Sequence, residues 1–129
     1  MAEDSEKSND QAVNLERIRE ATMGDEEFMV ELIDIYLDDS PTQISALRDA
    51  IEGQDGKVAA STAHRLKGSS GNLGADSLAA LCRQVEEAGR EDRVAAMPGL
   101  LSDIEHEFSR VKECLSAVRQ DSADKGFPE

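Results

Sequence analysis

His64 lies in a segment whose spacing predicts a helix with one apolar face and one bare face. The apolar face repeats at steps of four, three, four and three, through Ala59, Ala63, Leu66, Ser70 and Leu73. His64 lies about 140° from the centre of this stripe, so we expect its imidazole to face away from the core. An exposed imidazole is mostly neutral at pH 7 and offers a ring nitrogen as a nucleophile without a separate base. The pattern therefore predicts a histidine that is available for nucleophilic chemistry.

Two glycines and a lysine share the bare face with His64. Gly68 and Gly71 follow one and two turns later, and Lys67 lies three residues after the histidine. Each glycine in a helix interior costs about 1 kcal/mol relative to alanine, so a pair of them beside one histidine indicates that something must approach the backbone closely. We expect a partner protein to dock on this face.

These residues belong to a longer motif that resembles the histidine-containing phosphotransfer (HPt) domains of bacterial and fungal phosphorelays. The motif is His64-x-Leu66-Lys67-Gly68-Ser69-Ser70-x-x-Leu73-Gly74-Ala75, followed by Leu78-x-x-Leu81-Cys82 and Glu86. The resemblance also includes residues 28–37, the Ser40-Pro41 junction and the Gly53-x-Asp55 turn, and it covers roughly residues 15–115.

The resemblance implies a phosphocarrier rather than an independent enzyme. It implies that His64 accepts a phosphoryl group on its outer ring nitrogen from the aspartyl phosphate of a receiver domain and passes it to an aspartate of another receiver. In this family the receiver supplies the magnesium ion and most of the catalytic machinery, so we expect no cofactor and no metal site on this chain. The implied partners are response regulator receiver domains and a hybrid sensor histidine kinase.

The resemblance also suggests roles for residues near His64. The ammonium group of Lys67 lies one turn away and can reach the phosphoryl oxygens, so it would stabilise the phosphoryl group. Docking of the receiver is assigned to Arg65, Gly68, Gly71, Glu86 and Arg90.

Glu86 departs from the family pattern. In relatives a polar residue at this place, often glutamine, hydrogen-bonds the inner ring nitrogen of the histidine. A carboxylate would orient the ring, yet it would also repel the phosphoryl group. A plain surface glutamate is the alternative role, and Arg90 either neutralises Glu86 or contacts the receiver.

The 129-residue chain has the length of one domain, and its net charge of −14 limits its partners. Nucleic acid and anionic membranes are poor partners because a negative field repels polyanions. Residues 57–93 are nearly neutral, with six basic and five acidic residues, so this window would tolerate an acidic receiver.

Cys82 and Cys114 lie in apolar stripes and are expected to be buried thiols. Residues 1–11 do not resemble a signal peptide, and we expect a cytoplasmic protein and a monomer.

Periodicity and capping signals predict six helices. The first is short, carries Leu15 and Ile18, and ends near Gly24. The second begins after the N-cap Asp25. The third begins at Ser40-Pro41, where a capping residue precedes proline at the first helical position.

The fourth helix, which bears His64, begins after Asp55 and ends near Gly74. The fifth begins at Asp76 or Ser77 and is closed by Gly89. The sixth begins near Pro98, with a seam formed by Leu101, Ile104, Phe108, Val111, Leu115 and Val118.

The fold expected from these helices is all-α. The third to sixth helices should form an antiparallel up-down four-helix bundle, with one or two extra short helices at the N-terminus. Residues 12–120 would form this bundle, between disordered tails at residues 1–11 and 121–129.

Three alternative functions share parts of this pattern. A di-iron bundle would need paired Glu-x-x-His motifs, but Glu105 directly precedes His106, and His64 is the other histidine. A helical adaptor would have the same helices, with His64 and Lys67 incidental. A domain phosphorylated by a chemotaxis-type kinase would carry the same motif. Acid-labile, base-stable phosphate on the chain would separate a phosphotransfer domain from an adaptor.

Overall fold

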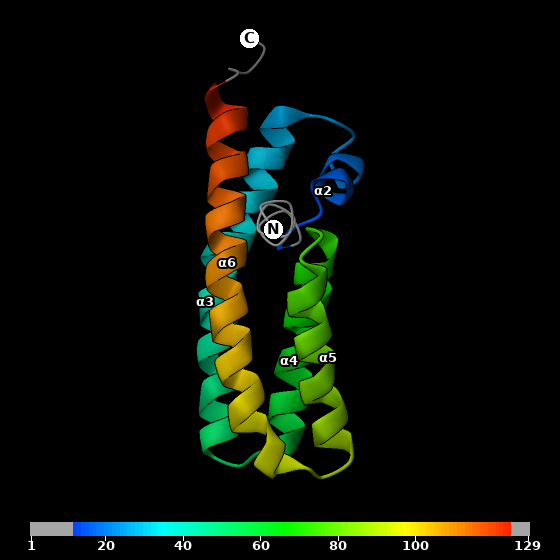
Figure 1. Cartoon of the computed structure of the whole chain (residues 1–129), viewed down its shortest axis with the longest axis vertical. Helices are drawn as coiled ribbons and strands as arrows, with labels where there is room; N and C mark the ends of the chain where they lie inside the picture. Colours follow the sequence, from blue (N-terminus) through cyan, green and yellow to red (C-terminus); the bar gives the residue numbers. More distant parts are fainter. Residues whose placement is uncertain (1–11, 125–129) are drawn as a thin grey trace, which may run out of the picture.

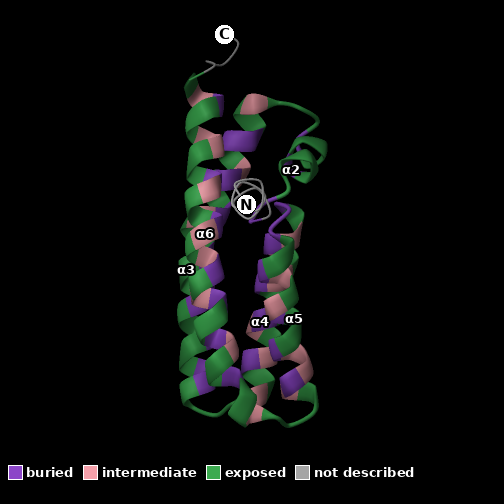
Figure 2. Ribbon diagram, in the orientation of Figure 1, coloured by how far each residue is buried: buried purple, intermediate pink, exposed green. Residues whose placement is uncertain are grey.

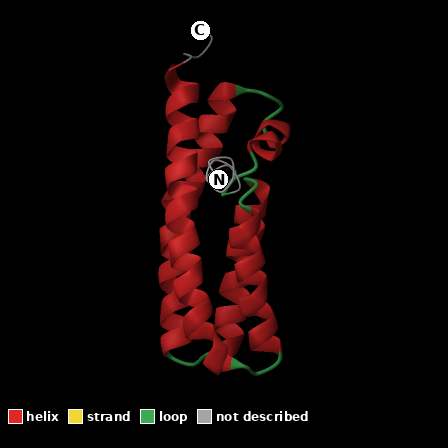
Figure 3. Ribbon diagram, in the orientation of Figure 1, coloured by secondary structure: helices red, strands yellow, loops and turns green. Residues whose placement is uncertain are grey.

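The structure, a computed structural model, describes residues 12–124, and this part of the chain is helical without any strand (Figure 3). The elements in chain order are α2 (Leu15–Ala21), α3 (Glu26–Glu52), α4 (Gly56–Asn72), α5 (Asp76–Arg90), the short 3₁₀ helix η1 (Val94–Ala96) and α6 (Met97–Asp124). Residues 1–11, expected to be a tail, lie outside the described residues. The predicted all-α class is confirmed.

The four long helices form an antiparallel bundle (Figure 1). Helix α3 packs on α4 and α6, and α5 packs on α4 and α6, with the most extensive contact between α4 and α5. Helices α3 and α6 extend beyond the ends of α4 and α5, and α2 lies beside that extension (Figure 1). Buried residues lie on the inner faces of all four long helices (Figure 2). Helix α2 is the one extra short helix among the described residues.

Aspartate caps begin two of the helices where the sequence predicts them. The Oδ1 atom of Asp25 accepts a hydrogen bond from the backbone N–H of Phe28 at 3.1 Å. The equivalent atom of Asp55 accepts one from the N–H of Val58 at 3.2 Å. Each cap satisfies a backbone donor that the first turn leaves unpaired, and each fixes where the helix starts.

The predicted helix boundary at Ser40-Pro41 is wrong, because α3 continues through Pro41 without a break. Proline removes one backbone donor from the helix. The buried positions nevertheless follow one continuous face across it, comprising Ile33, Tyr36, Ser40, Ile44, Leu47 and Ile51. The burial of this face holds the two halves of α3 in line, and tertiary packing therefore outweighs the local stop signal.

Gly74 ends the segment that bears His64, as predicted. Its φ of +74° is in the left-handed region, and its carbonyl accepts a hydrogen bond from the N–H of Asn14 at 2.8 Å. A Cβ at Gly74 would lie 2.5 Å from the carbonyl oxygen of Asn14. Glycine is therefore required both by the backbone conformation and by the close approach of the chain.

Gly89 has a different role from the predicted one. Helix α5 continues through it to Arg90, and a Cβ at this position would lie 2.8 Å from both Cβ of Ala60 and the carbonyl oxygen of Gly56. The glycine therefore allows α4 and α5 to approach closely. This approach matters for function because the residues around His64 come from these two helices.

Helix α6 extends past residue 120, into the segment expected to be a tail, and ends at Asp124. Ser122 is buried, and its hydroxyl lies 3.6 Å from the sulfur of Met29. Arg119 forms an ion pair with Asp34 at 2.5 Å. These contacts join the last turns of α6 to the first half of α3. The seam predicted for this helix is buried or partly buried throughout.

Cys82 is buried and Cys114 is partly buried, and neither forms a disulfide. Within residues 12–124, none of the helices has the length and apolar character that crossing a membrane would require.

Candidate functional site

His64 projects from α4 into solvent, with 67% of its side chain exposed. The predicted packing stripe on the opposite side of the helix is fully buried, from Ala59 through Leu73. The burial of this apolar face therefore fixes how α4 is oriented about its own axis. This orientation places the imidazole outside the core. The expected exposure of His64 is confirmed.

Glu86 of α5 connects His64 to Lys67. Its Oε2 lies 2.8 Å from Nδ1 of His64, and its Oε1 lies 2.6 Å from Nζ of Lys67. The Glu86 side chain is only 12% exposed, whereas Lys67 is 32% exposed. One carboxylate thus holds two neighbouring side chains of α4 from the side of α5. The expectation that Glu86 can reach His64 is confirmed by this contact.

The Glu86 carboxyl group is ionised at neutral pH. Partial burial by itself raises its pKa, but the hydrogen bonds and positive charge of Lys67 and His64 outweigh burial and leave the pKa below its usual value. An ionised carboxylate can only accept hydrogen bonds. Nδ1 of His64 is therefore the donor, and in the neutral ring Nε2 keeps its lone pair.

Two buried groups beneath this surface are uncharged. Burial raises the pKa of the Cys82 thiol to about 12, and the Glu86 carboxylate adds to the shift. Burial also raises the pKa of Tyr36. Neither group therefore supplies a negative charge near His64 at neutral pH.

Gly68 and Gly71 leave the surface beside Lys67 open. A Cβ added at either glycine would meet nothing within 4 Å, so packing inside this chain does not explain them. They border a surface depression of about 700 Å³ whose other lining residues come from α2, α4 and α5. Arg17 of α2 closes one side of it through an ion pair with Asp76 at 2.6 Å. The arrangement leaves space for another molecule.

The other predicted docking residues lie outside the hydrogen-bonded group. Arg65 and Arg90 are exposed, on α4 and α5 respectively. The positive charge that pairs with Glu86 comes from Lys67. The structure therefore brings together His64, Lys67 and Glu86, and it leaves Arg65 and Arg90 free of that group.

A buried hydroxyl pair below the site was not anticipated from the sequence. The hydroxyl groups of Tyr36 on α3 and Ser70 on α4 are 2.8 Å apart, and both side chains are buried. The sequence pattern places Ser70 on the packing face of this helix but does not identify a hydrogen-bond partner for it. The sequence signal that could have predicted this pair is Tyr36, which lies in an apolar stripe. A buried phenol needs a hydrogen-bond partner, so a tyrosine at such a position indicates a polar group opposite it. The pair ties the glycine-containing half of α4 to α3.

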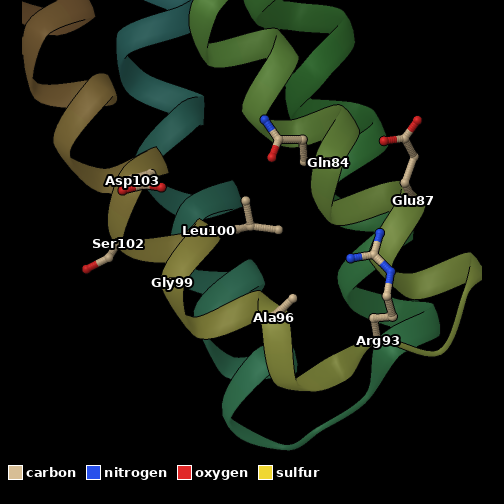
Figure 4. Close-up of a pocket in the computed structure, with 8 residues that line it drawn as sticks. All are labelled: Gln84, Glu87, Arg93, Ala96, Gly99, Leu100, Ser102 and Asp103. Carbon is tan, nitrogen blue, oxygen red and sulfur yellow. The ribbon is translucent and has the colours of Figure 1, made fainter.

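A separate depression of about 560 Å³ lies between α5 and α6 near the α5–α6 connection (Figure 4). It is lined by polar residues that include Glu87, Arg93 and Asp103, and no histidine contributes to it. Glu87 and Glu86 are neighbours in sequence but belong to different surfaces. Within residues 12–124, no three His, Cys, Asp or Glu side chains form a group that could hold a metal ion.

Comparison with known proteins identifies the class to which this fold and site belong. The family model for the Hpt domain matches residues 31–121, so the chain belongs to the Hpt domain family, whose members carry out histidine phosphotransfer in phosphorelays. No curated protein sequence gives a significant match.

Two solved structures are similar. Histidine-containing phosphotransfer protein B from Pseudomonas aeruginosa PAO1 shares 28% identity at a TM-score of 0.81, over 85% of this chain and 96% of that one. The HPT domain of a sensor hybrid histidine kinase from Shewanella shares 20% identity at a TM-score of 0.74, over 86% and 96% of the two chains. The second likeness supports the fold alone.

Proposed function

We propose that Nε2 of His64 takes a phosphoryl group from the aspartyl phosphate of one receiver domain and gives it to an aspartate of another. The observation that carries this proposal is the placement of the ring, whose Nδ1 is held by Glu86 while two thirds of the side chain is exposed. Family membership supports transfer through a histidine. The other histidine, His106, is exposed on α6 and next to Glu105, which pairs with Arg48.

Lys67 is proposed to stabilise the transferred group. Its ammonium is bound to the same carboxylate as His64, so it is held close to the ring. A phosphoryl group on Nε2 adds negative charge on that side, and a nearby ammonium offsets it. Gly68 and Gly71 would let the receiver approach the backbone of α4, and Arg65 and Arg90 would contact it at the edge.

In the proposed function the chain is a phosphoryl carrier without a catalytic activity of its own. Phosphoryl transfer depends mainly on in-line positioning and charge neutralisation, and the receiver would provide the magnesium ion for this. The proposed donors and acceptors are response regulator receivers and the receiver of a hybrid sensor kinase. The carrier would act as a monomer in the cytoplasm.

The proposal is tested by incubating the chain with a phosphorylated receiver domain and magnesium. We expect phosphate on the chain that is labile in acid and stable in base, and we expect it to disappear when a second, unphosphorylated receiver is added. Phosphate that arrives only from an ATP-bound kinase domain, and never from a set of receivers, would contradict the proposal.

A further inference from the structure

A small groove lies where α2, the start of α3 and the last turns of α6 meet. Its volume is about 200 Å³, and its lining is mostly apolar, with Leu15 from α2, Met29 from α3 and Val118 from α6. Asp121 and Ser122 form its wall toward the end of α6. The Leu15 side is 36% exposed, although Met29 beneath it belongs to the core. The groove therefore offers an apolar recess at the end of the bundle where α2 is attached.

Helix α2 separates this groove from the depression beside Lys67. Leu15 and Arg19 line the groove, whereas Arg17 and Glu20 line the depression, so opposite faces of one helix form a wall of each. On the depression side α2 is held by the ion pair between Arg17 and Asp76 at 2.6 Å. A group seated in the groove would hold the same helix from its other side.

Helix α2 depends on such tertiary contacts for its stability. It has seven residues, and its N-cap residue Asn14 forms no side-chain capping hydrogen bond. Ile18 is the buried residue of this helix. A helix of this length is marginal in water by itself, because nucleation is unfavourable and few backbone hydrogen bonds compensate for it. Apolar contact in the groove would therefore add directly to the stability of α2.

The two segments outside the described residues differ in what they could place in the groove. Residues 1–11 are polar or charged after Met1 and Ala2. Residues 125–129 include Phe127 and directly follow α6, whose last turns form one wall of the groove. An aromatic side chain has about 150–250 Å² of surface to bury. The residues after α6 are thus the better match to an apolar recess.

The sequence after α6 also sets the register of Phe127. The helix ends at Asp124, and Gly126 and Pro128 follow, which is the pattern of a helix that ends with a left-handed glycine. In this motif the residue after the glycine contacts the helix residues three and four places from its end. Those residues are Ser122 and Asp121, both of which line the groove. The motif would therefore bring Phe127 to the groove.

We propose that Phe127 occupies this groove and holds α2 against α3 and α6. The ring contacts Leu15 and Val118, and Gly126 provides the turn that directs the chain back onto the helix. The occupant is the chain's own segment, because the glycine-centred turn places the ring within reach of the last turns of α6. The inference does not rest on the proposed phosphotransfer.

The direct test is NMR of the full chain, with the signals of the Phe127 ring assigned by comparison with Phe127→Ala. We expect nuclear Overhauser effects between this ring and the methyl groups of Leu15 and Val118. Their absence would overturn the inference. A mixture of isotopically labelled and unlabelled chains gives the control for a second copy, and effects seen only between chains would overturn the inference as well.

Hydrogen exchange of the α2 amides measures what the contact contributes. In Phe127→Ala we expect exchange across residues 15–21 to be about tenfold faster, because burial of a phenylalanine contributes at least that factor to an equilibrium constant. Pro128→Ala is the matched control, since it changes the same segment one residue beyond the proposed contact. Its exchange should match that of the parent. Equal exchange in Phe127→Ala and the parent, or an equal increase in Pro128→Ala, would overturn the inference.

Leu15→Ala shows whether Phe127 acts through the groove. Truncation of Leu15 removes part of the proposed contact, so Phe127→Ala should accelerate exchange in α2 by clearly less than tenfold in a chain that carries Leu15→Ala. Val58→Ala is the control background, because Val58 is an exposed apolar residue of α4 that does not line the groove. The full tenfold effect of Phe127→Ala in both backgrounds would place the ring elsewhere. None of these measurements involves phosphate, so their failure and the failure of the proposed function are distinguishable.

Discussion

At the scale of the residue, the site consists of an exposed imidazole, an ammonium group and a carboxylate that holds them both. His64 and Lys67 come from one helix, and Glu86 comes from the next. The helical period places His64 and Lys67 on one face, so their proximity could be predicted from spacing. Their attachment to one shared carboxylate could not, because it depends on how closely α5 approaches α4.

Lys67→Ala tests the proposed role of the ammonium. Removing the charge should slow transfer from a phosphorylated receiver, or shorten the lifetime of the phosphohistidine, by about tenfold or more, because a charge-assisted hydrogen bond contributes about 1.5–3 kcal/mol and about 1.4 kcal/mol is tenfold. The measurement is the time course of phosphate on the chain by intact mass. Lys57→Ala is the control, since Lys57 is an exposed lysine of the same helix. Equal kinetics for Lys67→Ala and the parent would remove Lys67 from the mechanism.

At the scale of the element, α4 and α5 together position the side chains of the site, with His64 and Lys67 on α4 and Glu86 on α5. Helix α4 presents His64, the proposed acceptor, and the glycines of α4 and α5 have two distinct uses. Gly68 and Gly71 leave open surface, whereas Gly89 allows the two helices to touch. The sequence pattern predicted the first use from the clustering of glycines beside a histidine. It assigned Gly89 to a helix end, because a glycine near a predicted terminus has the same signature whether it stops a helix or packs against a neighbour.

Substitution of Gly68 separates folding from docking. Because nothing lies within 4 Å of an added Cβ, Gly68→Ala should raise the free energy of unfolding by up to about 1 kcal/mol, which is the helix propensity gained. The rate of phosphoryl transfer from a receiver should fall partly in Gly68→Ala and much more in Gly68→Leu. Phosphorylation by phosphoramidate should stay unchanged in both, since a small reagent needs no docking surface. Receiver transfer at the parental rate in Gly68→Leu would place docking elsewhere.

Gly89→Ala tests the close contact between α4 and α5. The added methyl group would lie 2.8 Å from Ala60 and from the Gly56 carbonyl, so we expect a loss of about 1–3 kcal/mol in the free energy of unfolding. Gly99→Ala is the matched control, because Gly99 is also in a helix and its Cβ would meet nothing within 4 Å. Chemical denaturation measures the free energy of unfolding of both variants. A Gly89→Ala variant as stable as Gly99→Ala would show that α4 and α5 are not packed this closely.

At the scale of the whole molecule, a long bundle carries the proposed site on an exposed face of α4 and α5. The all-α bundle and most helix starts could be predicted, because aspartate caps and apolar periodicity act locally. The continuity of α3 through Pro41 could not, since it depends on burial along the full length of the helix. The extension of α6 beyond residue 120 depends in the same way on contacts with α3 that are distant in sequence.

The measurement that tests the central claim most directly is receiver-dependent phosphate uptake, followed by intact mass, in the parent, His64→Gln and His106→Gln. We expect one phosphoryl group on the parent and on His106→Gln, and none on His64→Gln. Circular dichroism and thermal melting of His64→Gln should match the parent, because the imidazole lies outside the core. Phosphate on His64→Gln, or a large loss of its fold, would contradict the assignment of His64 as the acceptor.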